Sequence, residues 1–184
     1  ILLKLLSCSV KEIIFGQSKD VSFDVLDMSW DEYMKMVINK TSPFIALPMM
    51  GMFKCKECSI DECNGLQEAS NYLGLSYQYL NDVENLVGIN QDIFSDIYKG
   101  HPNAMLINIL EKLDLENKLK IKKEPKLLIN YINKKSIQEQ KSNINNLLED
   151  ARNQFHRVPM VVQPVLVSIE DEINDRLESL MEEK

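Results

Sequence analysis

The stretch Gly74-Leu75-Ser76-Tyr77-Gln78-Tyr79-Leu80-Asn81-Asp82-Val83-Glu84-Asn85 lies within a long helical pattern that runs from Ile60 to about Val87. On a helix that turns about 100° per residue, one side is a mostly apolar stripe: Leu66, Ala69, Leu73, Ser76, Leu80, Val83 and Val87. The opposite side is polar, and amides and small residues outnumber charges on it: Gln67, Asn71, Gly74, Gln78, Asn81, Asp82 and Asn85. Periodicity alone permits two interpretations of that side, a face that lines a polar cavity or an ordinary solvent-exposed face.

Helical patterns also cover most of the remaining chain, whereas the alternation typical of β-strands is scarce. The first helix is expected to run through Asp20 with Leu3, Leu6, Val10 and Ile13 on one face. Later helices are expected over residues 104–115, 127–132, 136–155 and 167–181. Because the sequence has no internal repeat and no low-complexity linker, we expect one all-α domain over residues 1–184.

Three Ser-x-x-Glu sequences are typical of capping boxes, in which the serine and the glutamate satisfy each other's backbone N–H groups. They begin at Ser29, Ser59 and Ser136, and each predicts the start of a helix. Pro43 and Pro48 follow the helix that Ser29 begins, and each should kink it because proline removes a backbone donor.

Composition restricts the possible functions. The 28 acidic residues outnumber the 21 basic ones, which gives a net charge of −7 and argues against nucleic-acid binding. The basic cluster at Lys118–Lys123 is short and precedes Pro125, so we interpret it as a solvated connection. No apolar run approaches the roughly 20 residues of a membrane span. We therefore expect a cytoplasmic protein with reduced thiols.

The four cysteines permit a zinc site or ordinary packing. Cys55, Cys58 and Cys63 have a spacing that metal sites use, and Cys8 could be a fourth ligand. However, Cys58 and Cys63 also occupy the two positions of a hydrophobic staple around the Ser59 capping box. We favour the staple.

Four short motifs follow one another in the first part of the chain: Phe15-Gly16-Gln17-x-x-Asp20, Lys40-Thr41, Gly74-x3-Gln78-x2-Asn81-Asp82-x2-Asn85, and Ser95-Asp96-Ile97-x2-Gly100-His101. Their order and spacing resemble the second half of the trans-isoprenyl diphosphate synthases, the polyprenyl synthetase family. That family has G-Q-x-x-D, K-T, G-x3-Q-x2-D-D-x2-D and S-D-L-x2-G-K in the same order. The match covers roughly residues 1–110. The resemblance implies an isoprenoid-synthase-like helical bundle.

The resemblance also implies a role for each matched residue. Lys40, Thr41 and Gln78 would be catalytic, and Lys40, Gln78 and His101 would bind the substrate diphosphate. Gln17 and Asp20 would line the same cavity. Asp82, Asn81 and Asn85 would ligate Mg²⁺, the cofactor that neutralises a departing diphosphate.

Two features depart from the family pattern. Asn81 and Asn85 stand where the family has aspartates, and an amide brings no charge to a metal. The first aspartate-rich motif of the family does not occur in the sequence, which opens inside a helix without an initiator methionine. We therefore expect a bundle that is incomplete at its N-terminus, or a relative that no longer performs the chemistry.

The implied function is that of a prenyltransferase in isoprenoid biosynthesis, which condenses isopentenyl diphosphate with an allylic diphosphate by Mg²⁺-assisted ionisation. A non-catalytic helical subunit that retains the fold is the alternative, and a peptide-modifying prenyltransferase of the same fold is a third hypothesis. Because members of the family are usually dimers, we expect a homodimer or a heteromer.

Overall fold

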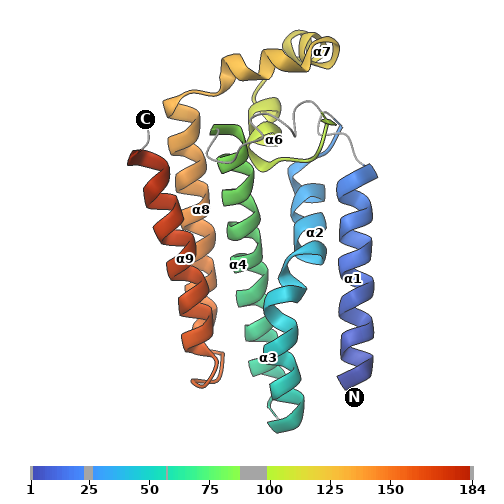
Figure 1. Ribbon diagram of the computed structural model, residues 1–184, viewed down its shortest axis with the longest axis vertical. Helices are drawn as coiled ribbons and strands as arrows, with labels where there is room; N and C mark the ends of the chain where they lie inside the picture. The colour runs from blue at the N-terminus through green and yellow to red at the C-terminus, as the bar shows by residue number, and fades with distance from the viewer. Residues whose placement is uncertain (1, 23–26, 57, 88–98, 183–184) are drawn as a thin grey trace.

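The computed structural model describes residues 2–22, 27–56, 58–87 and 99–182. Its elements are α1 (Leu2–Ser22), α2 (Trp30–Lys40), α3 (Ser42–Lys56), α4 (Ile60–Val87), α6 (Ala104–Glu111), α7 (Leu115–Lys123), a 3-10 helix η1 (Pro125–Tyr131), α8 (Lys134–Phe155) and α9 (Gln163–Glu182). Within these ranges the chain forms no strand, so the expected all-α bundle is confirmed (Figure 1). The Ser95–Ile97 part of the fourth motif lies outside the described residues.

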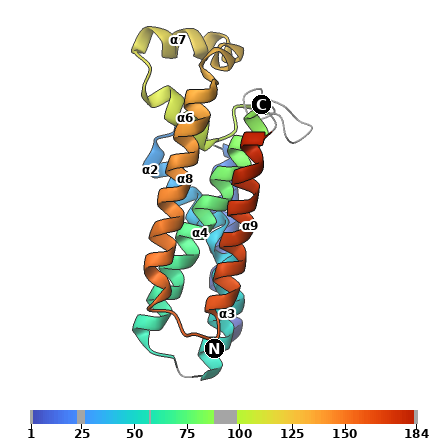
Figure 2. The same ribbon diagram turned by 90° about the vertical axis from the view of Figure 1, so that its left-hand side faces the viewer.

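Helix α4 is the centre of the bundle. It packs against α2 and α3 on one side and against α8 and α9 on the other (Figures 1 and 2). The predicted apolar stripe explains this position, because Leu66, Ala69, Leu73, Ser76, Leu80 and Val83 are all buried. Leu75, Tyr79 and Leu86 are buried as well, since neighbours surround α4 on more than one face.

The two capping boxes predicted at Ser29 and Ser59 are confirmed. The Glu32 carboxylate accepts a hydrogen bond from the backbone N–H of Ser29 at 3.0 Å, and the Glu62 carboxylate accepts one from Ser59 at 2.8 Å. In both boxes the serine hydroxyl accepts from the N–H of the glutamate. Cys58 and Cys63 both pack against the core beside the second box.

A break between α2 and α3 occurs at Thr41. Thr41 caps α2, and Pro43 then occupies the first turn of α3, where its missing N–H has no intrahelical partner to lose. Helix α3 continues through Pro48. The predicted change of direction thus comes two residues before Pro43, and it leaves Lys40 at the last position of α2.

Three expectations for the second half of the chain are wrong. Helix α8 begins at Lys134 and is capped by Asn133, with Ser136 as its N3 residue. Asn133 and Ser136 form the reciprocal bonds of a capping box, which places the cap three residues before the predicted one at Ser136. The supposed connection at Lys118–Lys123 belongs to α7, which Asp114 caps and which buries Ile121. Residues 125–131 form a 3-10 helix after Pro125.

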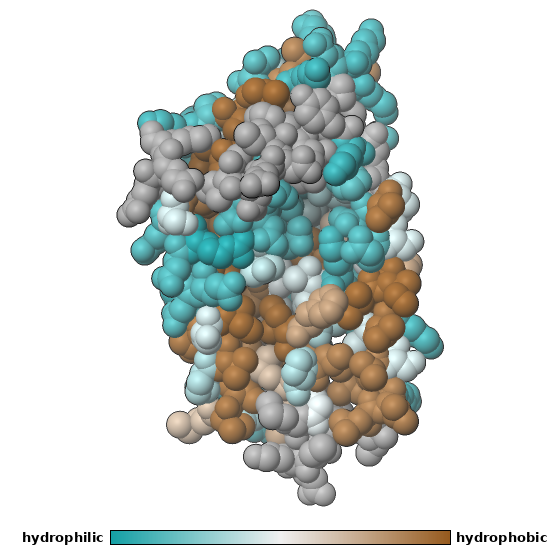
Figure 3. Space-filling model, viewed as in Figure 1, coloured by the Kyte–Doolittle hydropathy of each residue, from teal (hydrophilic) through white to brown (hydrophobic). Residues whose placement is uncertain are grey.

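Helix α1 packs inward through small residues, and its apolar side points mostly outward. Leu3, Leu6 and Val10 are exposed, and this part of the surface is strongly apolar in Figure 3. The buried residues of α1 are Ser9 and Gly16. A Cβ atom on Gly16 would lie 2.5 Å from the backbone nitrogen of Lys40. The backbones of α1 and α2 therefore touch next to Lys40.

Gly16→Ala is expected to lower the free energy of unfolding by about 1–3 kcal/mol, because two backbones must separate to admit a methyl group. Gly51→Ala is the matched control within a helix. Among the described residues, its Cβ would meet only the Cδ2 atom of Leu2, at 3.9 Å, so we expect a change of at most about 1 kcal/mol in the stabilising direction. Urea denaturation measures both, and equal effects would contradict the close approach at Gly16.

Candidate active site

Asp82 is the most buried of the three residues predicted to ligate a metal. It is 2% exposed, and its Oδ2 atom accepts hydrogen bonds from the Tyr33 hydroxyl and the Ala104 N–H, both at 2.7 Å. The Gln78 amide donates to Oδ1 at 2.8 Å. Because Tyr33, Asp82 and Ala104 belong to three different helices, this carboxylate joins α2, α4 and α6.

The pKa of the Tyr33 hydroxyl depends on its burial and on the charge of Asp82. Burial raises the pKa of Tyr33 well above its usual value, and the negative charge of Asp82 raises it further. The phenol therefore stays a hydrogen-bond donor over the physiological pH range. Trp30 stacks on the Tyr33 ring at a centroid distance of 5.3 Å and holds it in place.

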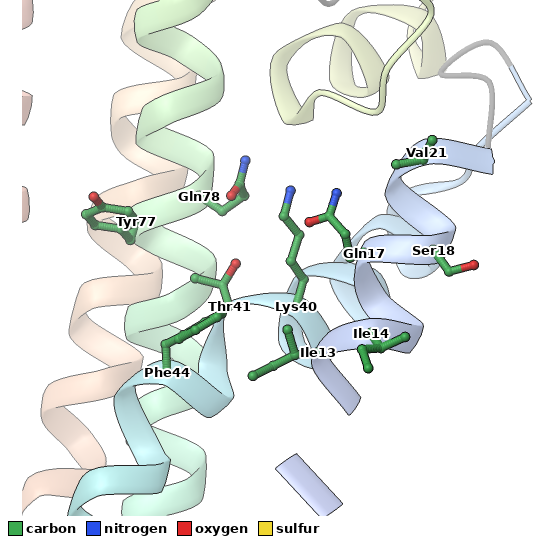
Figure 4. Close-up of a pocket in the computed structure, with 10 residues that line it drawn as sticks. All are labelled: Ile13, Ile14, Gln17, Ser18, Val21, Lys40, Thr41, Phe44, Tyr77 and Gln78. Atoms are coloured by element: carbon green, nitrogen blue, oxygen red, sulfur yellow. The ribbon is translucent and has the colours of Figure 1, made fainter. Parts of the chain in front are cut away.

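A cavity of about 630 Å³ opens between α1, α2, α3 and α4. Its described lining is Ile13, Ile14, Gln17, Ser18, Val21, Lys40, Thr41, Phe44, Tyr77 and Gln78. Figure 4 shows the polar ends of Gln17, Lys40 and Gln78 gathered at one end, with Ile13, Ile14 and Phe44 at the other. The cavity thus joins a cationic, amide-rich end to an apolar end.

Lys40 provides the positive charge at the polar end of the cavity. Its Nζ atom lies 2.8 Å from Oδ2 of Asp20, which also accepts a hydrogen bond from Gln17 at 3.1 Å. The Lys40 side chain remains 23% exposed, so the ammonium group is held and still reachable from the cavity. A lysine in this setting is a point charge suited to phosphate oxygens.

The structure brings together some of the predicted site residues and separates others. Four of them line the same cavity: Gln17, Lys40, Thr41 and Gln78. Asp20 forms an ion pair with Lys40 next to that cavity. Among the described residues, His101, Asn81, Asp82 and Asn85 are not part of that lining. His101 is partly buried in the segment that leads from Gly100 to α6.

Sequence reasoning missed the apolar wall of the cavity and one arginine. Ile14 and Phe44 are exposed apolar residues. Ile14 lies three residues from Gln17, and Phe44 lies three residues from Thr41, so helical spacing could have placed both on the wall of the predicted cavity. Arg176 of α9 donates to Asn81 Oδ1 at 2.6 Å. No local pattern indicated that contact, which spans 95 residues of sequence.

The contacts of Asn81 and Asp82 do not fit a magnesium site. The Asp82 oxygens already accept hydrogen bonds inside the core, and the Asn81 oxygen faces a positive guanidinium group. In the described part of the chain, no three His, Cys, Asp or Glu residues are grouped so that they could hold a metal ion. Magnesium requires several oxygen ligands around one point, and this motif does not provide them.

Residues 1–150 match the family model named polyprenyl synthetase, which is most of the chain. The chain belongs to the polyprenyl synthetase family. This confirms the resemblance to trans-isoprenyl diphosphate synthases that the four motifs indicated.

Two relatives within the polyprenyl synthetase family show how far the likeness extends. The chain is 28% identical over 123 residues to the short chain isoprenyl diphosphate synthase of Methanocaldococcus jannaschii, an alignment of 65% of this chain and 38% of that protein. It is 27% identical over 115 residues to the geranylgeranyl diphosphate synthase of Saccharolobus solfataricus, with 60% and 35% covered. The chain thus spans little more than a third of either relative.

Solved structures of polyprenyl synthetases share the fold. The heptaprenyl diphosphate synthase from Staphylococcus aureus matches with a TM-score of 0.77 and 21% identity, over 95% of this chain and 59% of that one. The decaprenyl diphosphate synthase from Rhodobacter capsulatus matches with a TM-score of 0.78 and 14% identity, over 98% and 60%. The isoprenoid-synthase-like bundle is therefore confirmed as a fold. Among the described helices, none combines the length and the apolar character needed to cross a bilayer.

Asp82→Ala is expected to lower the free energy of unfolding by about 3 kcal/mol, since it leaves the buried Tyr33 hydroxyl and Ala104 N–H without their acceptor. Tyr33→Phe removes one donor and should cost only about 1 kcal/mol. Chemical denaturation of the two variants measures the difference. An Asp82→Ala protein of unchanged stability would show that this carboxylate does not join the three helices.

Proposed function

We propose that this chain forms the diphosphate-binding wall of a prenyltransferase of the isoprenyl diphosphate synthase type, which condenses isopentenyl diphosphate with an allylic diphosphate. The observation that carries the proposal is the cavity with Lys40 at its polar end and an aliphatic and aromatic wall at its other end. An allylic diphosphate has the same division, a highly charged head on an apolar tail.

Lys40 would stabilise the departing diphosphate. Ionisation of the allylic carbon–oxygen bond leaves the bonding electrons on the diphosphate, so a fixed positive charge beside those oxygens lowers the barrier. Asp20 orients the ammonium group through an ion pair at 2.8 Å. A diphosphate carries more negative charge than one carboxylate and would compete well for the same donor.

Gln17, Thr41 and Gln78 would orient the substrates around Lys40. Their side chains reach the same end of the cavity in Figure 4, where they offer amide and hydroxyl groups without additional charge. The Gln78 amide is fixed by its bond to Asp82, so its position is set before substrate binds. Ile13, Ile14 and Phe44 would cover the isoprenoid tail and keep water from the carbocation.

Magnesium is the cofactor that the family resemblance implies for Asn81, Asp82 and Asn85, and the contacts of Asn81 and Asp82 do not fit it. We therefore assign no step to a metal ion held by that motif. Among the matched residues, Lys40 is the cationic side chain that lines the cavity.

The cavity is open, and the outward apolar face of α1 adjoins it through Ile14. Since about two fifths of each solved chain that shares this fold lies outside the match, we propose that further helices cover this side. They would come from the same protein or from a partner subunit, in a homodimer or a heteromer. We propose a cytoplasmic location on the composition of the sequence.

Lys40→Met is expected to lower kcat/KM for the condensation by about 10²-fold, because it removes a charge that acts on the leaving group. The full protein is assayed with isopentenyl diphosphate and a short allylic diphosphate, and released pyrophosphate and prenyl product are both measured. Lys35→Met is the matched control, an exposed lysine on the same helix, and should leave the rate unchanged.

Unchanged kcat/KM in the Lys40→Met protein would overturn the assignment of the diphosphate end. Absence of condensation in the unmodified protein, with every acceptor tried, would favour the non-catalytic subunit that retains the fold.

A further inference from the structure

Arg176 of α9 binds one face of α4 at the end where the second aspartate-rich motif of the family lies. Its Nε atom donates to Glu84 Oε1 at 3.0 Å, and its Nη2 atom donates to Glu84 Oε2 and to Asn81 Oδ1, both at 2.6 Å. The guanidinium carbon also lies 5.0 Å from the centre of the Tyr77 ring. Tyr77, Asn81 and Glu84 are spaced four and three residues apart, so one helical face presents all three groups.

The charge of Arg176 is required at this position. Glu84 is 6% exposed, and a buried carboxylate is costly without a positive partner. Burial alone would lower the pKa of Arg176, but the hydrogen bond and negative charge of Glu84 outweigh it, and the net shift is upward. The guanidinium therefore remains charged and forms a two-pronged pair with Glu84.

The same guanidinium group excludes a metal ion from Asn81. A divalent ion on Asn81 Oδ1 would sit beside a nitrogen that already donates to that oxygen at 2.6 Å. The existing hydrogen bond uses one of the two lone pairs of Oδ1, and the positive charge of the guanidinium would repel an ion at the other. Glu84, a carboxylate on the same face, already pairs with the same arginine.

We infer that the guanidinium group of Arg176 takes the cation position of this motif, so that Asn81, Asp82 and Asn85 bind no divalent ion. The inference rests on the family membership that underlies the proposed function, and its readout is ion binding instead of turnover. The inference also explains why an amide stands at position 81 where the family has an aspartate. A neutral amide leaves one carboxylate for one guanidinium, whereas an aspartate at position 81 would place two carboxylates against it.

The test measures Mn²⁺ binding by the EPR signal of the free ion, and pyrophosphate binding with and without Mg²⁺ by calorimetry, on the full chain. Asn81→Ala and Asn81→Asp should each change the Mg²⁺ dependence of pyrophosphate binding by less than about twofold. The double variant Asn81→Asp, Arg176→Gln leaves two carboxylates on one helical face without their cation. It should bind Mn²⁺ at least about tenfold more tightly than the unmodified chain.

The matched control is Asn81→Asp with Arg152→Gln. Arg152 pairs with the buried Glu170 between α8 and α9, away from this face, so its loss should add no Mn²⁺ affinity. The inference is overturned if Asn81→Ala weakens Mg²⁺-dependent pyrophosphate binding tenfold, or if Asn81→Asp alone gains Mn²⁺. A folded double variant without added Mn²⁺ affinity also overturns it. Should the double variant fail to fold, the two single variants decide the question.

Discussion

The buried carboxylate of Asp82 is the interaction on which the remaining structure depends. A charge inside a helical bundle is tolerated only where donors surround it, and Tyr33 and Ala104 bring two such donors from α2 and α6. The backbone oxygen of Asp82 also accepts from Asn103, the cap of α6. One residue of α4 thereby fixes where α2 lies and where α6 begins. Through Gln78 it also fixes one wall of the cavity.

Close backbone contacts then bring the remaining motif residues to that wall. Gly16 lets α1 touch α2 at Lys40, and Gly74 lets α4 approach Ser42, whose backbone nitrogen would lie 3.1 Å from an added Cβ. The two motif glycines thus hold Gln17 and Gln78 on either side of the Lys40-Thr41 break. Short motifs such as Gly16-Gln17 and Lys40-Thr41 indicate little about the fold when taken singly. In order along the chain they are informative, because each lies at a contact between helices that brings the others to the same cavity.

The parts of this arrangement that depend on local sequence could be predicted. The caps at Ser29 and Ser59 involve residues three apart, and the stripe on α4 follows from helical period alone. Burial of Asp82 could not be predicted, because its partner Tyr33 lies 49 residues away and periodicity assigned Asp82 to the polar side. The cap at Asn133 was missed for a different reason, since asparagine and serine are equivalent caps and both were available.

The two cations near α4 illustrate why equal charge does not mean equal function. Lys40 is a point charge on a flexible stem that pairs with one oxygen of Asp20 and stays 23% exposed beside a cavity. Under the proposed function, the diphosphate of the substrate would replace Asp20 as its partner. Arg176 uses its fork on both oxygens of Glu84, whose side chain is 8% exposed, and a third acceptor completes the set. Without Arg176 the buried carboxylate of Glu84 would lose its positive partner. Displacement of Arg176 by a ligand would therefore cost several kcal/mol, on the order of the penalty for an unpaired buried charge. Under the proposed function Lys40 would serve binding, whereas Arg176 joins α9 to the central helix α4.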